Sequence, residues 1–392
     1  MPFFSFRFGQ KAFVVLSFLV LFAFNPQVLS ADVPNRTLSG AQLVQTLRDN
    51  PENHAARWAL AQASFKVGRY DIARYHVERL LRTTSSQANL DTLTEALAKI
   101  TEADPWGTEF NFALLPSTNI RRLTYNDKFI TLLGTFTPTG GGQVESGIGL
   151  TFGAGLSYGI NLPDSSRLTL SARVDQNVFD SSDLNKTVVQ FAAKRDAYAI
   201  GRSTTIEPYA RFRLDESQSI ERRYLGLRLS TRWWSENNKQ TQVSLVGENR
   251  EAPESSASNG PHGSIKVRHS FDLDDRTRFG AEMVLSRSRP EGSYLRYWQH
   301  QLSADVSRRF AVLGTVGLFG NVTLRGYDDI FPLTDIIRED ESVTLGVSYR
   351  PARIEVFGSR PKISCQVEKN ASNIALYDYE TTDCRITFGR SF

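Results

Sequence analysis

Histidine is the first residue type to consider for catalytic or metal chemistry, because its imidazole serves both as a general base and as a metal ligand. The five histidines of this chain are His54, His76, His262, His269 and His300. No two of them have the spacing of a metal site, and no Ser, His and acidic residue form a hydrolase signature. We therefore expect a protein that is not an enzyme and that holds no metal or other cofactor.

The only two cysteines, Cys365 and Cys384, favour a disulfide bond. They fall in the last two predicted strands, on either side of the connection Asn370–Thr381. Alternation places both side chains on one face, and their spacing suits opposite residues of an antiparallel hairpin, where Cβ atoms come close enough to be bridged. An oxidising compartment promotes such a bond. Two buried, unbonded thiols are the alternative.

A third chemical feature is a set of charged residues that alternate with apolar residues and so share one face of their strands. In a closed barrel this face lines the lumen. The predicted lumen-lining charged residues are Arg173, Asp175, Glu207, Arg211, Arg213, Arg228, Arg232, Glu248, Lys266, Arg268, Glu282, Asp305 and Arg325. They predict either a lumen that is packed and hydrated by opposite charges or a conduit that prefers acidic or unfolded polypeptide.

The strands that position these residues follow one pattern, best seen in Ser166–Phe179. Its apolar Leu168, Leu170 and Val174 alternate with polar residues over more than about ten positions, which is the length that a tilted strand needs to cross a bilayer. The same period of two begins after Trp106 and continues to the end of the chain. We expect an antiparallel transmembrane β-barrel of about fourteen strands over residues 106–392, since bacterial barrels have an even number.

The connections and the last strand support an outer-membrane barrel. Predicted connections alternate between long, polar ones and short ones, as expected for the outer and inner sides. Trp233, Trp234, Tyr297, Trp298 and Tyr349 lie near strand ends, where an aromatic girdle belongs. The chain ends on an aromatic strand, and such strands resemble the signal that the barrel assembly machinery reads. The residues that would carry this signal are Phe388 and Phe392.

Residues 37–103 have a helical period instead. The order of small and aromatic residues around Gly68 resembles a tetratricopeptide repeat, in which paired helices pack closely. We expect a small all-α domain with helical grooves that bind a partner; a generic helical plug or cap is the alternative. The residues that mark the partner-binding helices are Leu60, Phe65, Tyr70, Ala73 and Val77.

The N-terminus and the charge distribution indicate where the protein works. Basic residues precede the apolar run Ala12–Phe24, so residues 1–31 are predicted to be a secretory signal peptide, with a single spanning anchor as the alternative. The net charge of +4 is spread over the strands, which gives no nucleic-acid footprint. We expect a barrel in the outer membrane of a Gram-negative bacterium, in contact with its lipid, with the helical domain in the periplasm.

Two local motifs add a family resemblance. The run Trp106–Phe112 leads to Pro116–Ile120, and Ala371–Tyr379 precedes the last strand. This layout resembles the surface lipoprotein assembly modulators, the Slam family, in which a periplasmic tetratricopeptide-like domain precedes a fourteen-strand barrel. Here Pro116 and Ser117 replace the Asp of the family's first-strand motif, and the N-terminal domain is short.

The resemblance implies an outer-membrane translocator that assists surface display or secretion of a lipoprotein or a related binding protein. The partners would be that substrate and the barrel assembly machinery, with the barrel itself monomeric. A passive porin and a polysaccharide-export barrel remain alternatives. Porins lack a helical domain, and exporters usually carry many more repeats.

Overall fold

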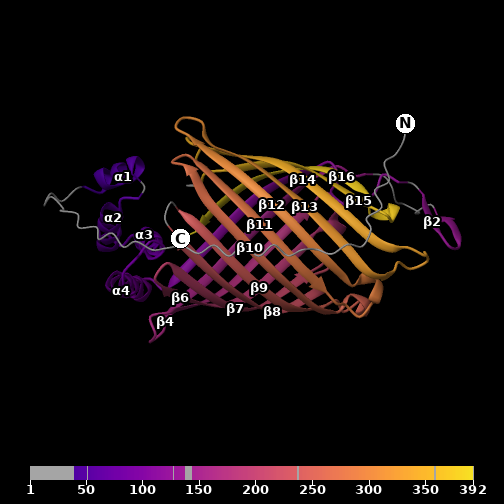
Figure 1. The fold of residues 1–392 in the computed structure, drawn as a ribbon, viewed down its shortest axis with the longest axis horizontal. Coiled ribbons are helices and arrows are strands. Elements are labelled where there is room, and N and C mark those ends of the chain that lie inside the picture. Colours follow the sequence, from indigo (N-terminus) through magenta and orange to yellow (C-terminus); the bar gives the residue numbers. More distant parts are fainter. Residues whose placement is uncertain are drawn as a thin grey trace, which may run out of the picture. The chain divides into compact units, whose positions relative to one another are not determined.

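A computed structural model describes residues 39–50, 52–126, 128–136, 144–235, 238–356 and 359–391. The predicted signal peptide and the terminal Phe392 lie outside these described residues. The described chain forms a region of four helices followed by a β-barrel. Figure 1 shows the coiled ribbons of the helices and the tilted strands of the barrel.

The helical region consists of α1 (Gly40–Asp49), α2 (His54–Lys66), α3 (Tyr70–Leu81) and α4 (Gln87–Ala103). The side chain of Asn53 accepts a hydrogen bond from the N–H of Ala56 and so caps the start of α2. Gly68, in the turn after α2, has a φ of +74°, a conformation that glycine adopts without steric cost. None of the described helices combines the length and the apolar character needed to span a membrane.

Small and branched side chains hold the helices together. Ala61, Ala73, Val77 and Leu81 are each no more than 2% exposed and belong to one apolar core that also includes residues of α4. The paired helices that the periodicity predicts are present. Such pairing is common to many helical domains and does not by itself identify a tetratricopeptide repeat.

The barrel contains fourteen antiparallel strands, as the alternation predicted. They are β1 (Trp106–Ser117), β4 (Gly147–Asn161), β5 (Arg167–Phe179), β6 (Lys186–Ala199), β7 (Arg202–Leu214), β8 (Ile220–Ser235), β9 (Lys239–Glu251), β10 (Gly260–Asp274), β11 (Thr277–Ser288), β12 (Tyr297–Phe310), β13 (Gly314–Ile330), β14 (Ile337–Pro351), β15 (Lys362–Ser372) and β16 (Tyr379–Ser391).

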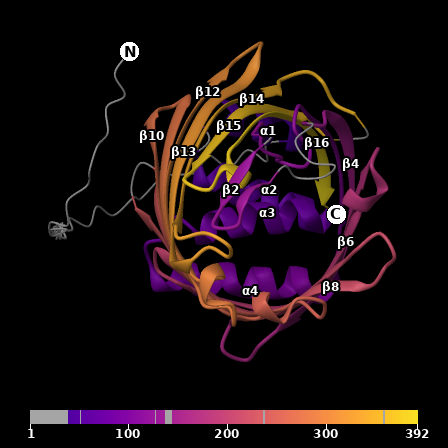
Figure 2. The same cartoon turned by 90° about the vertical axis from the view of Figure 1, so that its right-hand side faces the viewer.

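Closure of the sheet comes from the first and last strands. β1 pairs with β4 on one side and with β16 on the other, so that Phe112 lies opposite both Phe152 and Phe388. Each other strand pairs with its neighbours in sequence. The resulting ring of strands is visible in Figure 2. A closed ring leaves no unpaired edge, which is what lets a sheet reside in lipid.

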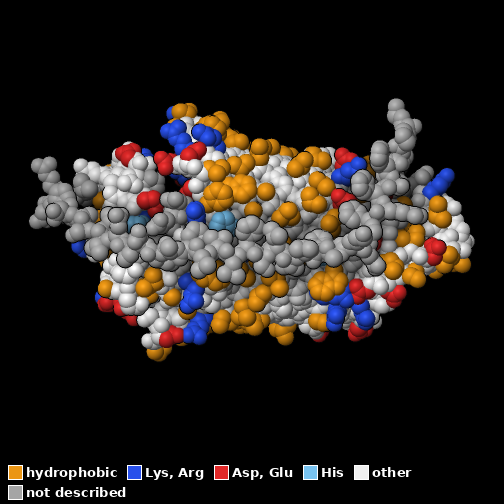
Figure 3. Space-filling view, in the orientation of Figure 1, with side chains coloured by type: hydrophobic (Ala, Val, Ile, Leu, Met, Phe, Trp, Pro, Cys, Tyr) orange, Lys and Arg blue, Asp and Glu red, His pale blue; other side chains and the backbone are white. Residues whose placement is uncertain are grey.

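The outer face of the barrel is apolar. Leu225, Leu302 and Leu345 each have more than half of their surface exposed, which is consistent with a wall that contacts acyl chains. On the face seen in Figure 3, hydrophobic side chains cover much of the middle of the wall, and charged side chains gather toward its two ends. The protein is thus built as a membrane barrel.

Two details differ from the expectation. The long connection after β1 contains a hairpin, β2 (Phe129–Thr131) with β3 (Gly134–Phe136), that the alternation did not predict because its strands are so short. In the predicted aromatic girdle, Trp298 and Trp233 are exposed on the outer face, but Tyr297 and Trp234 lie on the opposite face of the same strands and contact lumen arginines. Adjacent residues of a strand point to opposite sides, so two neighbouring aromatics cannot share one girdle.

The helical region contacts the barrel at the side of the short connections. The Nδ2 of Asn161, at the end of β4, donates to the carbonyl of Ala98 in α4 at 2.9 Å. Arg167 at the start of β5 lies 3.6 Å from Glu78 of α3. Tyr198, near the end of β6, packs against the helical core. These contacts join α3 and α4 to three consecutive strands.

Candidate functional site

The inner face of β4 carries a row of glycines, and side chains of neighbouring strands occupy the space beside it. We call this row the glycine corridor; its members are Gly149, Gly153, Gly155 and Gly159. A Cβ at Gly153 would overlap the side-chain oxygens of Asn111 and Asp175. The room that glycine leaves lets Arg173 of β5 reach across β4 and donate to Asn111 of β1 at 2.6 Å. This hydrogen bond spans β5, β4 and β1, and therefore links three strands next to β1, the strand that closes the barrel.

Charged side chains around this corridor pair extensively. Arg173 binds Asp175 at 2.6 Å and Glu109 of β1 at 2.8 Å. Further along the wall, Arg228 binds Glu207 at 2.6 Å. The lumen at this side is therefore charged but largely neutralised.

The most buried acid of the lumen is Glu248, whose side chain is only 4% exposed. The hydroxyl of Tyr209 donates to it at 2.5 Å, the Nε of Arg250 donates at 2.7 Å, and Arg211 lies at 3.7 Å. The guanidinium of Arg211 also lies 4.1 Å from the ring centre of Tyr224. A charge removed from water costs free energy unless it is paired in this way.

A second cluster follows on the next strands. Glu282 lies 3.3 Å from Lys266 and 3.7 Å from Arg268, and Arg268 also binds Asp305 at 2.5 Å. We call these paired side chains the paired wall. Its members are Glu109, Arg173, Asp175, Glu207, Arg211, Arg228, Glu248, Arg250, Lys266, Arg268, Glu282 and Asp305.

Three of the predicted lumen residues lie outside this group. Arg213 binds Glu221 at 2.8 Å near the outer end of the strands. Arg232 donates to the amide oxygen of Gln242 and forms no ion pair with any described residue. Arg325 lies on the other side of the lumen, in the pocket described next.

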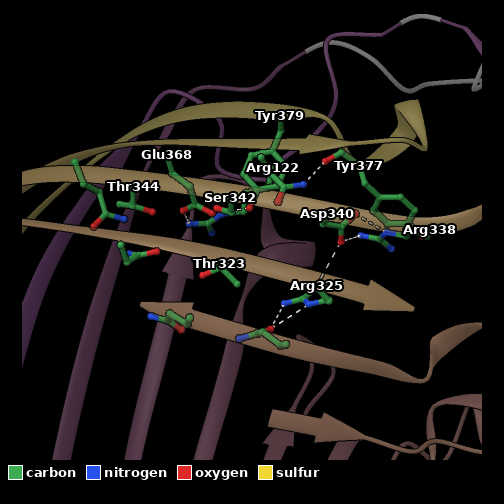
Figure 4. A pocket seen from close by; sticks show the side chains of 15 residues that line it. Arg122, Thr323, Arg325, Arg338, Asp340, Ser342, Thr344, Glu368, Tyr377 and Tyr379 are labelled. Carbon is green, nitrogen blue, oxygen red and sulfur yellow. Dashed lines mark hydrogen bonds and ion pairs between the residues drawn. The ribbon is translucent and has the colours of Figure 1, made fainter. Parts of the chain in front are cut away.

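A pocket of about 390 Å³ lies on the inner wall formed by β12–β16 (Figure 4). Asp340 lies between two arginines: Arg338 binds it through two hydrogen bonds of 2.9 and 2.8 Å, and Arg325 lies 4.0 Å away. At the opposite rim, Glu368 accepts from Arg122 at 3.0 Å and from the Tyr379 hydroxyl at 2.6 Å. The charges of the pocket are thus matched at its edges.

One part of the pocket wall is uncharged. Its side chains are amides and hydroxyls on β13, β14 and β15, and within the described ranges none of them forms a hydrogen bond with another residue. We call this group the neutral wall; its members are Asn321, Thr323, Ser342, Thr344 and Gln366. Thr323 lies directly opposite Ser342, and Asn321 directly opposite Thr344, yet neither pair is bonded.

Most residues of this pocket were absent from the sequence prediction. Arg338 and Asp340 were missed because Arg338–Glu341 are all charged, so the alternation of apolar and polar residues does not show that β14 starts at Ile337. Arg122 lies outside the barrel strands and reaches the pocket only through the path of its loop, which no periodicity reveals.

The family motif Pro116–Ile120 lies at the closing seam. The N–H of Thr118 donates to the carbonyl of Thr382 at 3.0 Å, and the N–H of Thr382 donates back to the Thr118 hydroxyl at 2.8 Å. Asn119 is 1% exposed, and its Nδ2 donates to the carbonyl of Glu380. These contacts extend the pairing of the first and last strands into the outer connections.

The outer connections are also joined by charge. Arg121 binds Glu145 at 2.6 Å and Asp183 at 2.5 Å. The hydrogen bond from Arg121 lowers the pKa of Asp183, and hydrogen bonds from Ser181 and then Arg121 lower the pKa of Glu145. Both carboxylates therefore remain charged well below neutral pH.

The two cysteines lie opposite each other. Cys365 of β15 is the register partner of Cys384 of β16, with Cα atoms 4.1 Å apart and sulfur atoms at bonding distance. The pair alternates with the lumen residues Gln366 and Asp383, so it lies on the outer face.

The residues predicted to mark partner-binding helices have different environments. Leu60, Ala73 and Val77 are buried between the helices, so a partner cannot contact them in this arrangement. Phe65 is 37% exposed, and its ring contacts that of Tyr70. Any partner surface on the helices must therefore use side chains other than those that create the periodicity, because periodicity marks the buried face.

Histidine chemistry is not apparent. Burial, together with Arg57 and Arg79, lowers the pKa of His76 to about 4, so this histidine of α3 is neutral at physiological pH. His269 and His300 are exposed on the outer face of the barrel. Among the described residues no group of His, Cys, Asp and Glu has a geometry suited to a metal ion.

The family of this chain follows from a match that covers its barrel. Residues 106–392 match the family model of the surface lipoprotein assembly modifier. The chain belongs to this family. The match begins at the first residue of β1 and spans the whole barrel. The family and its outer-membrane barrel are not of an enzymatic type.

Solved structures of similar fold are outer-membrane proteins. A loop L8 deletion mutant of OmpT from Vibrio cholerae is 10% identical, with 74% of this chain and 100% of that chain covered and a TM-score of 0.38. The channel DcaP of Acinetobacter baumannii is 9% identical, with 73% and 96% covered and a TM-score of 0.40. At these scores the assignment depends on the family match and on the barrel itself. The chain matches none of the curated proteins with which it was compared.

Proposed function

We propose that this protein is an outer-membrane translocator that assists the surface display or secretion of a lipoprotein or a related binding protein. The observation that carries the proposal is the family match over the whole barrel, because that family is defined by surface lipoprotein assembly. Membership supports a lipoprotein substrate, and a lumen that passes such a substrate must suit a polypeptide.

The lumen supports this role through its chemistry. Its charged side chains are mostly paired, so a passing chain meets few uncompensated charges that would hold it tightly. Its uncharged side chains can hydrogen-bond to any peptide group. A path that binds weakly at several sites favours both entry and exit of a substrate.

The helical domain, residues 37–103, would act in the periplasm as the recruiting element. Supporting this, the described helices contact the barrel at the side of the short connections, which face the periplasm in bacterial barrels. A substrate held there is next to the lumen. Export to this compartment would use residues 1–31 as a signal peptide, and insertion would use Phe388 of β16 and the terminal Phe392.

Deletion of the gene in its native host tests the function. Intact cells are labelled with a membrane-impermeant biotin reagent, and labelled proteins are identified by mass spectrometry. We expect one or a few lipoproteins or secreted proteins to disappear from the surface and accumulate inside, and wild-type protein to restore them. An unchanged surface set, with slower uptake of small solutes, would instead favour a passive porin.

A second experiment separates the two parts of the chain. Deleting residues 37–101 should leave the barrel inserted while the affected substrate remains in the periplasm. Normal surface display by this truncated protein would contradict a recruiting role for the helices.

A further inference from the structure

The neutral wall gathers five free hydrogen-bonding side chains in one pocket. Nearly every charged lumen side chain has a partner within the protein, whereas the five members of the neutral wall have none among the described residues. Amides and hydroxyls both donate and accept hydrogen bonds. Five such groups on three neighbouring strands, unpaired and facing a pocket, suit an uncharged polar ligand.

The pocket has the size and the enclosure of a binding site. Its volume of about 390 Å³ falls within the range of ligand pockets, about 300–1,000 Å³. Ion pairs hold Arg338 and Glu368 in place, and Figure 4 shows Ser342 between them and Thr344 next to Glu368. Because the charged groups are paired, the neutral groups remain as the surface on which a ligand would lie.

We propose that the neutral wall is a binding site for the backbone of an extended polypeptide, the substrate in transit. An extended chain carries one donor and one acceptor at each peptide group, all of them unpaired until they meet a partner. Side chains that donate and accept without charge can pair with those groups whatever the sequence of the passing chain. This inference rests on the proposed function and adds where the substrate is contacted and by which chemistry.

A glycan also offers neutral hydrogen-bonding groups, but the aromatic rings of the pocket argue against one. Saccharide sites commonly present a free aromatic face on which the sugar ring stacks. Here arginines lie over both tyrosines that line the pocket: Arg338 lies over Tyr377, and Arg122 lies 6.0 Å from the ring centre of Tyr379. The hydrogen-bonding side chains remain available while the stacking surfaces are occupied, which favours the peptide.

Binding to the purified full-length protein in detergent tests the inference. The probe is a fluorescein-labelled, uncharged and unstructured peptide of Gly, Ser and Asn, and the readout is fluorescence anisotropy. The test variant combines Asn321→Ala, Thr323→Val, Ser342→Ala, Thr344→Val and Gln366→Leu. We expect its Kd to rise at least about tenfold, since several modest hydrogen bonds are lost together.

Two further variants guard against misfolding. Ser230→Ala with Ser264→Ala removes two lumen hydroxyls on β8 and β10 and should leave the Kd within about twofold, because neither side chain lines the pocket. Asn321→Asp with Gln366→Glu preserves side-chain size but removes amide donors, and should also weaken peptide binding. Heat-modifiable migration on a gel checks that each variant forms a barrel.

Three outcomes would overturn the inference: wild-type affinity in a folded neutral-wall variant, equal loss in the Ser230 and Ser264 control, or displacement of the peptide by a maltooligosaccharide. Surface labelling of cells that carry the neutral-wall variant separates this inference from the proposed function. Full restoration of surface display, with unchanged peptide binding, would contradict the binding site but not the translocator function. A gene deletion without effect on the surface would contradict the translocator function, and the peptide measurement would still test the binding site.

Discussion

The paired wall and the neutral wall use opposite means to line one barrel. On the paired wall, long charged side chains neutralise one another across strands, as Arg173 does with Glu109 of β1 and Asp175 of β5. On the neutral wall, amides and hydroxyls remain unpaired, and the ion pairs of these strands, such as Arg338 with Asp340, lie beside that group and not within it. In the proposed function, one part of a polar lumen therefore contributes to stability while another offers hydrogen-bonding groups to a substrate.

Removing the hub of the paired wall should have the largest effect. Glu248→Ala would leave Arg250, Arg211 and the Tyr209 hydroxyl without their shared acceptor, and breaking a buried charge pair costs about 3 kcal/mol or more. We expect a correspondingly lower free energy of unfolding, measured by urea titration of the barrel in lipid vesicles with tryptophan fluorescence. Glu251→Ala, on the exposed end of the same strand, is the control and should change stability by less than about 0.5 kcal/mol.

Removing the predicted disulfide should give the largest loss of stability among changes to β15 and β16. Replacing Cys365 and Cys384 by Ala frees the last hairpin, and the chain-entropy model gives a loss of about 3 kcal/mol at most for a loop of this size. The same titration, with and without reductant, measures it. Labelling of both thiols in the unreduced wild-type protein would falsify the bond, and an equal response of wild type and variant to reductant would contradict its contribution.

The glycine corridor offers a sharper test on a single strand. Gly153→Ala places a Cβ against Asn111 and Asp175, whereas Gly155→Ala meets its nearest neighbour, the Cβ of Glu109, at an ordinary 3.6 Å. Overpacking costs about 1–3 kcal/mol, so Gly153→Ala should destabilise the barrel while Gly155→Ala should be nearly neutral. Both substitutions lie on the inner face of β4. Equal stability of the two variants would show that Asn111 and Asp175 can move aside without lowering the free energy of unfolding.

The smallest effect on stability is expected on the neutral wall. Thr323→Val with Ser342→Ala removes two hydroxyls that have no partner in the described protein, so the free energy of unfolding should change by less than about 0.5 kcal/mol. Unfolding in urea measures it beside the Glu248 variant. A loss as large as that of Glu248→Ala would mean that the neutral wall is structural, and the contrast between the walls would disappear.

Sequence alone determined the architecture because it depends on a local period. The alternation in Ser166–Phe179 and its successors specified a fourteen-strand barrel, and the change of period near Trp106 separated it from the helices. The same parity rule assigned faces to side chains, including the lumen arginines and the two cysteines. It failed where neighbours share a strand end, as with Tyr297 and Trp298, and it missed Arg338, whose sequence neighbour Glu339 is also charged.

Tertiary structure decided which side chains meet. Ion pairs such as Arg268 with Asp305, which lie 37 residues apart, depend on the register and tilt of three strands. The need for glycine at position 153 likewise becomes clear only in the folded barrel, where Asn111 and Asp175 occupy the space that a Cβ would fill. Periodicity is a property of one strand, whereas partners and pockets belong to several, so the neutral wall emerged only from the closed barrel.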